Sequence, residues 1–428
     1  MRRRSDRSPP EPPPDRRRGV EVPSAPAVVP TALAAPPRDR RLRIAYVTET
    51  WLPTVNGVVT RLSSTALELS RRDHELLVIA PARCDQPVKG VQVTGVPSLG
   101  IPFIYAGQPW GLPLPRVWSV LDRFGPDLVH AVNPVLLGWA GISYARRRKI
   151  PLVCSYHTHV AQYARFYHLG VAERLAWSVI CRAHRLADLN LVTSSASAAE
   201  LSARGICRIR IWRRGVDLHR FRPRAPSPGM RARLTSGHPE RRLVLYVGRL
   251  APEKSLERLR PLTTVSDLHL ALVGDGPARS RLAAVLAGDR VTFTGELHGE
   301  ELAAAYASAD VFVFPSTTDT LGLALLEALA SGLPVVAART PASAELLEGM
   351  VAGELVSPDD DRELMAAVDR LLGGEPDRPA IARALRRVAT DWSEVTEELL
   401  GHYGDALDGA RARARSLTVR AHGPLPDP

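Results

Sequence analysis

Short apolar runs alternate with amphipathic segments of helical length from Arg43 onward. In the first half of the chain the apolar runs are RIAYVTE at 43–49, HELLVIAP at 74–81, DLVHAV at 127–132, PLVCSYHT at 151–158 and LNLVTSS at 189–195. Such runs are typical of buried parallel strands, and the amphipathic segments between them are typical of crossover helices. The pattern predicts an α/β domain with a parallel sheet over residues 42–222.

The alternation stops and then resumes. Residues 223–241 contain Pro223, Pro226, Pro228 and Gly229, which favour a linker. The second series of apolar runs is RLVLYVGRL at 242–250, LHLALVGDGP at 268–277, RVTFTGEL at 290–297, DVFVFPS at 310–316 and PVVAAR at 334–339. We therefore expect a second domain over residues 242–410. Two Rossmann-like, doubly wound domains would face each other across a cleft at the carboxyl ends of their strands.

The chain ends differ from this core. Residues 1–41 are rich in proline and arginine without apolar periodicity, and residues 411–428 form a short basic end, so we expect two disordered tails. No apolar stretch follows the basic start as in an export signal, and none reaches the ~18 residues of a spanning helix. Four widely spaced cysteines, Cys84, Cys154, Cys181 and Cys207, suggest neither zinc nor disulfides. A cytoplasmic location is expected, with the cytoplasmic face of the membrane as an alternative.

The net charge of +11 is unevenly distributed. Residues 42–222 carry 23 basic and 11 acidic side chains, whereas residues 223–410 carry 19 basic and 28 acidic ones. This asymmetry favours an anionic partner, such as a membrane surface, for the first domain; merely solvated faces are the alternative. Part of the basic excess lies in the tails and no nucleic-acid-reading module is visible, which argues against a nucleic-acid partner.

A candidate diphosphate site follows the first strand of the second series. Gly248 ends that strand, Arg249 comes next, and Lys254 lies where a helix is expected to begin near Pro252. A glycine turn, free amides at a helix start and two cations suit a diphosphate. Solvated cations at a strand end are the alternative interpretation.

A pair of acidic residues brackets another helix start. Asp319 lies in a loop, Gly322 opens the helix, and Glu327 falls in its early turns, while Gly332 and Pro334 close it. One carboxylate can hold sugar hydroxyls and the other ribose, with the helix dipole directed at phosphate. Two exposed surface acids are the alternative, which the apolar residues around Glu327 disfavour.

Four motifs together carry a family resemblance. GRLAPEKSLE at 248–257, VGDGP at 273–277, FTGEL at 293–297 and D-x7-E at 319–327 resemble the retaining family 4 glycosyltransferases of GT-B fold. The first Glu of that family's E-x7-E pair is Asp here. SYHTHV at 155–160 and HRLADLNLV at 184–192 resemble sulfolipid synthases, whereas TWLPTVNGVVTRL at 50–62 resembles GDP-mannose-dependent lipid mannosyltransferases.

The resemblance implies a role for each matching residue. Arg249 and Lys254 would neutralise the diphosphate leaving group, and Gly248, where the backbone turns sharply, would belong to the nucleotide-sugar site. Asp319 and the backbone of Thr320, Leu321 and Gly322 would hold the transferred sugar. Glu327 would bind ribose, and Glu296 and Leu297 would face the base. His157 would lie near the reacting centre, and Gly57 would let the backbone approach phosphate and acceptor.

Two departures from the family accompany these matches. Arg339, Thr340, Pro341 and Ala342 replace a usual Gly-Gly pair, and Leu321 replaces a usual Phe. Asp359 to Asp361 precede a predicted helix and are interpreted as its cap rather than as a metal site. The resemblance implies no cofactor or metal.

The expected activity is retaining transfer of a hexose from a UDP- or GDP-sugar to a hydroxyl group of an acceptor, and the expected acceptor is a membrane lipid. A soluble acceptor such as a cyclitol or secondary metabolite is the alternative. A nucleotide-sugar epimerase, or a sensor of the same fold, is a remoter one. Asp319→Ala and Glu327→Ala are both expected to abolish transfer without unfolding the protein.

Overall fold

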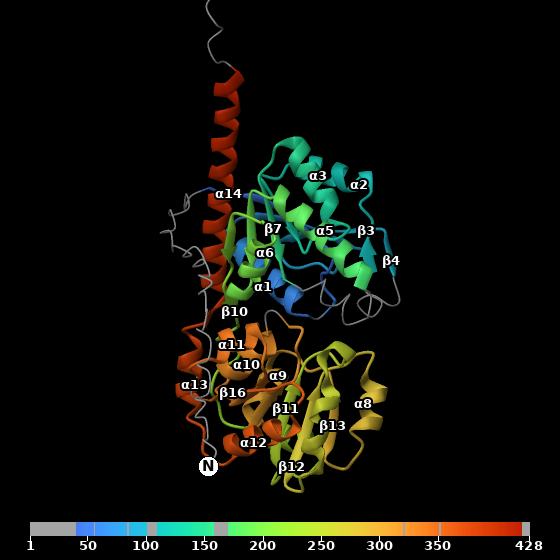
Figure 1. Ribbon diagram of the computed structural model, residues 1–428, viewed down its shortest axis with the longest axis vertical. Coiled ribbons are helices and arrows are strands. Elements are labelled where there is room, and N and C mark those ends of the chain that lie inside the picture. Colours follow the sequence, from blue (N-terminus) through green and yellow to red (C-terminus); the bar gives the residue numbers. More distant parts are fainter. Residues whose placement is uncertain are drawn as a thin grey trace, which may run out of the picture. The chain divides into compact units, whose positions relative to one another are not determined.

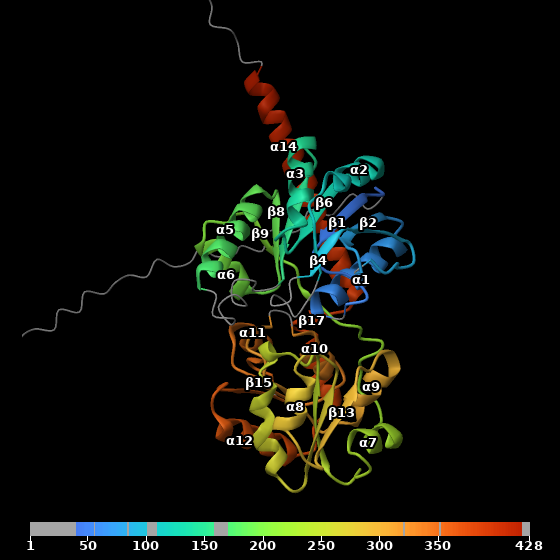
Figure 2. The same ribbon diagram turned by 90° about the vertical axis from the view of Figure 1, so that its right-hand side faces the viewer.

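The computed structural model describes residues 40–54, 56–83, 85–100, 109–157, 170–319, 322–350 and 352–421. Two parallel sheets with helices on both faces organise these residues (Figures 1 and 2). The two sheets bear out the doubly wound α/β architecture that the alternating pattern predicts.

The first sheet has seven parallel strands in the order β3-β2-β1-β6-β7-β8-β9. Its strands are β1 (Arg43–Thr48), β2 (Glu75–Pro81), β3 (Val91–Val96), β6 (Leu128–Val132), β7 (Leu152–Tyr156), β8 (Leu189–Val192) and β9 (Ile209–Ile211). Five of these strands fall in the predicted apolar runs, while β3 and β9 add the two edges of the sheet. A pairing of β4 (Ser98–Gly100) with β5 (Pro109–Gly111) is separate from it.

Helices cover both faces of this sheet. One face packs against α2 (Pro115–Phe124), α3 (Gly138–Arg148) and α5 (Gly170–Leu186), and α6 (Ser195–Ala203) lies beyond β8. The other face packs against α1 (Gly57–Arg71) and α14 (Trp392–Ala421). The long helix α14, red in Figure 1, thus comes from the far end of the chain to complete the first core.

The second sheet has six parallel strands in the order β13-β12-β11-β14-β15-β16. Its strands are β11 (Arg242–Val247), β12 (Leu268–Val273), β13 (Val291–Gly295), β14 (Val311–Phe314), β15 (Val335–Ala338) and β16 (Gly353–Val356). The strands β11 to β15 match the second series of apolar runs. The edge strand β16 has no such run, because its pattern is GELV with only Val356 buried.

The helices of the second half form two layers. One layer packs into a common core with one face of the sheet and consists of α7 (Pro228–Leu234), α9 (Gly299–Ser308), α10 (Leu323–Ala330), α11 (Pro341–Leu347) and α13 (Arg378–Leu385). The opposite face packs against the 3-10 helix η3 (Leu256–Thr264), α8 (Arg279–Val285) and α12 (Asp361–Leu372). A further 3-10 helix, η2 (Pro252–Lys254), follows β11.

Two segments differ in detail from the pattern. The proline-rich stretch expected to be a linker contains α7, whose Met230 and Leu234 are buried in the second core. Pro228 lies in the first turn of α7, where proline is tolerated, and Ser227 caps the helix. The helix α14 continues to Ala421, past residue 410. Between the two sheets, β10 (Arg214–Gly215) pairs with β17 (Ala389–Thr390).

Candidate donor site between the two sheets

A cleft of about 800 Å³ opens at the carboxyl ends of strands from both sheets. Its walls include the residues after β1, β6 and β7 from the first half and those after β11, β12 and β14 from the second. Ten predicted site residues line it, namely Gly57, His157, Gly248, Arg249, Lys254, Glu296, Leu297, Asp319, Gly322 and Glu327. The fold therefore brings these residues together, while Thr320 and Leu321 lie outside the described residues.

The loops after β11 and β12 approach each other backbone to backbone. A Cβ atom on Gly274 would lie 2.0 Å from the carbonyl oxygen of Gly248, and Gly274 has φ +136°. Both facts restrict this position to glycine, because an L side chain would meet backbone that cannot move aside. The close approach holds Arg249 and the VGDG loop in the same wall of the cleft.

Lys254 and Asp319 form a two-pronged ion pair across the site. The Nζ atom of Lys254 lies 2.6 Å from Oδ1 and 2.8 Å from Oδ2 of Asp319, and both side chains are largely buried. Burial opposes the charged form of Lys254, but Asp319 together with Tyr246 and Glu253 outweighs burial, so the pKa of Lys254 is raised. The cation predicted for phosphate and the carboxylate predicted for sugar are therefore in direct contact.

Glu327 projects from the second turn of α10 and is held by a residue of α9. The hydroxyl of Tyr306 donates a hydrogen bond of 2.8 Å to Oε2 of Glu327. Burial raises the pKa of Glu327 to about 7, although the bond from Tyr306 favours its charged form. Gly322, the N-cap of α10, has φ +61°, a left-handed conformation that suits glycine. The start of α10 thus adds its unpaired amides to this wall of the cleft.

His157 follows β7 and faces the opposite wall. Its backbone N–H donates to Oδ1 of Asn133 at 2.9 Å, and its Nε2 lies 2.8 Å from the hydroxyl of Ser155. Burial, followed by the charge of Arg61, lowers the pKa of His157 well below its ordinary value. The imidazole is therefore neutral near pH 7 and acts as a hydrogen-bonding group rather than a cation.

Helix α1 begins at the cleft as well. Asn56 is its N-cap and accepts a hydrogen bond of 2.9 Å from the amide of Val59, and Gly57 is its first residue. The positive end of a 15-residue helix is a favourable place for a phosphate group. The first half of the chain thus offers this helix start and His157, while the second half offers Lys254, Asp319 and Glu327.

Comparison with known proteins decides the family. Two family models match in succession, Glycosyltransferase Family 4 over residues 55–220 and Glycosyl transferases group 1 over residues 241–373. A GDP-mannose-dependent alpha-mannosyltransferase of Mycolicibacterium smegmatis is 41% identical over 380 residues, covering 87% of this chain and 100% of that protein. The chain is a family 4 glycosyltransferase.

Two further proteins, one compared by sequence and one by structure, are similar to this glycosyltransferase. Sulfoquinovosyl transferase SQD2 of Arabidopsis thaliana is 36% identical, covering 88% of this glycosyltransferase and 75% of the plant protein. Sucrose-phosphate synthase of Thermosynechococcus elongatus has a similar structure, with a TM-score of 0.62 at 21% identity and coverage of 89% and 100%. The structural match supports the GT-B fold that the motifs predict.

The glycosyltransferase also has cleft residues that its sequence motifs did not single out. Oε1 of Glu49 accepts hydrogen bonds from the amides of Leu136, at 2.7 Å, and Gly138, at 3.1 Å. Burial raises the pKa of Glu49 to about 7, and its Oε2 has no partner within the described part of the chain. The sequence does indicate Glu49 as a cleft residue, because it lies directly after β1 and strand ends face the cleft. No sequence feature indicates that Tyr306 contacts a cleft residue, because it lies within a helix.

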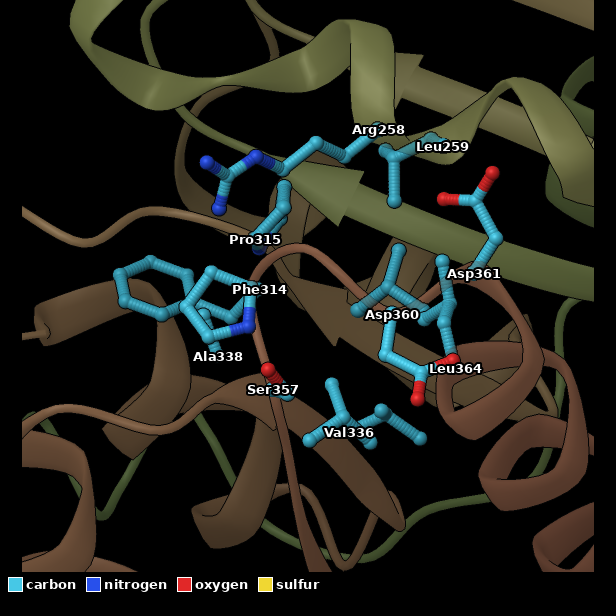
Figure 3. A pocket seen from close by; sticks show the side chains of 13 residues that line it. Arg258, Leu259, Phe314, Pro315, Val336, Ala338, Ser357, Asp360, Asp361 and Leu364 are labelled. Atoms are coloured by element: carbon cyan, nitrogen blue, oxygen red, sulfur yellow. The ribbon is translucent and has the colours of Figure 1, made fainter.

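A second, smaller hollow shares Phe314 with the cleft (Figure 3). It measures about 20 Å³, room for about one water, and lies between η3 and α12. Asp360, on its rim, accepts hydrogen bonds from the amides of Arg362 and Glu363 and is the N-cap of α12. The prediction that this acidic run caps a helix is confirmed. The Arg339 to Ala342 segment likewise leads into α11, where Thr340 and Ser343 form a capping box.

Proposed function

We propose that this glycosyltransferase moves a hexose, with retention of configuration, from a nucleotide-diphosphate donor to a hydroxyl group of a membrane lipid. The Lys254 and Asp319 ion pair carries the proposal, since it sets a phosphate-binding cation against a hydroxyl-binding carboxylate at one point of the cleft. That point corresponds to the joint between diphosphate and sugar in a bound donor. GDP-mannose is the first donor to test, because the relative from M. smegmatis is named for it.

The proposed chemistry needs charge stabilisation more than a general base. The bond from sugar C1 to the phosphate oxygen breaks as the acceptor oxygen bonds to C1 on the same face. The acceptor's proton passes to the departing diphosphate, whose negative charge Arg249 and Lys254 stabilise. Because these side chains supply the positive charge, transfer is expected to proceed without a metal ion.

Transfer is tested with GDP-mannose, UDP-glucose and UDP-sulfoquinovose as donors and with 1,2-dioctanoylglycerol and a membrane lipid extract as acceptors. An α-linked product from an α-linked donor, formed equally in EDTA and in manganese, is the expected result. Activity that disappears in EDTA and returns with manganese would overturn the metal-free mechanism. Nucleotide-sugar binding with no acceptor-dependent release of nucleotide would instead favour a sensor.

The lipid acceptor is supported by the basic first half of the chain, although part of its charge is used internally. Arg213 pairs with Glu398 at 2.6 Å, Arg210 with Asp405 at 3.8 Å, and the buried Arg214 with Glu345 at 3.3 Å. These arginines hold the first half to α14 and α11. Among the described helices, none combines the length and the apolar character needed to cross a membrane.

The C-terminal end of α3 is the better surface for anionic lipid. Arg147 and Lys149 are exposed there, and both are basic. Sedimentation with vesicles of phosphatidylglycerol and phosphatidylcholine is expected at low salt and to weaken in Arg147→Glu/Lys149→Glu. An absence of wild-type sedimentation at both low and physiological salt, with turnover of a soluble cyclitol in lipid-free buffer, would favour the soluble acceptor.

A further inference from the structure

A buried chain of hydrogen bonds leads from His157, at the cleft, to Tyr403 in the middle of α14. Nε2 of His157 and Nε2 of His130 each lie 2.8 Å from the hydroxyl oxygen of Ser155. Nδ1 of His130 lies 2.8 Å from the hydroxyl of Tyr403, which contacts the hydroxyl of Tyr46 at 3.3 Å. All five side chains are buried. The chain therefore links two histidines through a single serine hydroxyl.

The serine permits only two proton arrangements along this chain. Ser155 has one hydroxyl hydrogen, and the two imidazoles are the only hydrogen-bond partners of that hydroxyl among the described residues, so the arrangement that gives this hydrogen an acceptor has Ser155 donate to one histidine and accept from the other. Each histidine is neutral, because burial, followed by the charge of Arg61, lowers the pKa of His130 to about 3 and that of His157 well below its ordinary value. A neutral imidazole has one N–H and one lone pair, so fixing one end of the chain fixes the other end.

The tyrosine end selects one arrangement. The hydroxyl of Tyr403 donates its hydrogen to the hydroxyl oxygen of Tyr46 at 3.3 Å. With its own hydrogen used, the oxygen of Tyr403 accepts from His130, which carries its hydrogen on Nδ1. Ser155 therefore donates to His130 and accepts from His157.

We propose that Tyr403 is a positioning residue that holds His157 in the neutral tautomer with its hydrogen on Nε2. The lone pair of His157 then lies on the buried Nδ1, so any group that hydrogen-bonds to Nδ1 must be a donor. The importance of this tautomer for turnover rests on the proposed transfer reaction. The tautomer itself is a property of the protein alone.

Arg61 and Trp212 keep the two histidines of this hydrogen-bond chain neutral and fixed in position. Arg61 is fully buried, its guanidinium lies 4.0 Å above the Trp212 ring, and it donates to the carbonyl of Trp212 at 2.5 Å. The Trp212 ring in turn contacts the rings of His157, at 5.4 Å between centroids, and His130, at 5.9 Å. A fixed cation beside both imidazoles disfavours a second positive charge. Proton positions in the chain are therefore governed by hydrogen bonding.

Removing the Tyr403 hydroxyl should reverse the arrangement. In Tyr403→Phe the Nδ1–H of His130 would face an apolar ring, so the tautomer of His130 with hydrogen on Nε2 becomes favoured. That tautomer donates to Ser155, which then donates to Nε2 of His157. His157 is left with its hydrogen on Nδ1. A change on α14 would thus invert the donor and acceptor nitrogens of an imidazole at the cleft.

Nitrogen NMR of protein labelled with ¹⁵N-histidine tests the proposal, since the two neutral tautomers have distinct ring-nitrogen shifts. Wild-type His157, assigned with His157→Gln, is expected to carry its hydrogen on Nε2 and Tyr403→Phe to move it to Nδ1. Tyr144→Phe, which removes a tyrosine hydroxyl bonded to Asp122 outside the chain, is the matched control and should leave His157 unchanged. A wild-type hydrogen on Nδ1, or equal effects of the two tyrosine variants, would overturn the proposal.

Turnover adds a second measurement. Tyr403→Phe is expected to lower kcat about tenfold with donor KM within about twofold, because the donor still binds while a hydrogen bond at the reacting centre is misdirected. Ser155→Ala should break the chain and make a further Tyr403→Phe change without effect on His157. If Tyr403→Phe does not fold, the tautomer of His157 measured in the wild type and in Ser155→Ala still tests the proposal. A protein that has the predicted tautomers but transfers no sugar would refute the proposed function. It would still support the proposal that Tyr403 positions His157 through hydrogen bonds.

Discussion

Tyr306 of α9 donates a hydrogen bond of 2.8 Å to Glu327 of α10, so the carboxylate at the base of the cleft is held from a neighbouring helix. The bond occupies Oε2 and restricts the orientation of the whole group. A carboxylate oriented in this way would accept the hydroxyls of the predicted ribose without first losing side-chain freedom.

Glu327→Gln is expected to weaken binding of GDP-mannose by about 1.5–3 kcal/mol, because a hydrogen bond to a charged acceptor is replaced by one to a neutral amide. Tyr306→Phe should weaken it less, by about 1 kcal/mol, since the carboxylate remains. Calorimetric titration measures both. Glu345→Gln is the control, because Glu345 lies outside the cleft lining and pairs with Arg214. A Glu327→Ala protein that is folded and fully active would show that the donor site is misassigned.

Asp319→Ala is expected to abolish transfer and yet to tighten binding of the free nucleoside diphosphate several-fold. In the unliganded protein Lys254 is bonded to Asp319, and phosphate must compete for it. Removing the carboxylate releases the cation and makes the site more positive. Lys254→Ala should instead weaken diphosphate binding by about 1–2 kcal/mol. Weaker diphosphate binding in Asp319→Ala, measured by titration with GDP and UDP, would contradict this account.

The contribution of Glu327 to stability is expected to fall as the pH rises from about 4.5 to 7, and it is measured as the difference between the wild type and Glu327→Gln. Burial raises the pKa of Glu327 from its ordinary value of 4.5 to about 7, so the folded state retains a proton that the unfolded state loses. This contribution is complete below pH 4.5 and is lost as the pH rises through 7, by on the order of 3 kcal/mol. Urea unfolding of Glu327→Gln should lack it. Glu49, whose pKa is also raised to about 7, contributes a similar fall that Glu49→Gln removes.

Gly274→Ala is expected to destabilise the protein by about 2–4 kcal/mol and to abolish donor binding, because the new Cβ would displace the Gly248 backbone. Gly404→Ala, in α14 with open space around it, is the matched control. It should be neutral or stabilise the protein by about 0.5–1 kcal/mol. Thermal unfolding compares the two. Equal effects would show that the close approach does not constrain the loop.

The sequence predicted the central strands and most of the site for one physical reason. Buried parallel strands appear as continuous apolar runs, and their carboxyl ends carry residues such as His157, Gly248 and Arg249 that the fold brings to one cleft. Edge strands such as β9 and β16 could not be predicted from apolar runs, because they are short and only partly buried.

Contacts between distant segments could not be read from the sequence. The bonds of Tyr306 to Glu327 and of Lys254 to Asp319 join residues on separate elements, and neither residue pattern indicates its partner. The sequence around Arg210, Arg213 and Arg214 is also ambiguous, because ion pairing with α14 or α11 and exposure to an anionic partner have the same local sequence. Only the tertiary structure shows whether such an arginine pairs within the protein or is exposed to an anionic partner.

The way α14 completes the first core has a consequence for synthesis of the chain on the ribosome. Val395, Leu399 and Tyr403 are fully buried in the same cluster as Ile44 and Tyr46 of β1. A nascent chain therefore exposes the part of this sheet face that α14 covers until residues 392–403 have been translated, although α1 covers another part earlier. The two halves are not sequential folding units, and the N-terminal sheet waits for the C-terminal helix before it can become native.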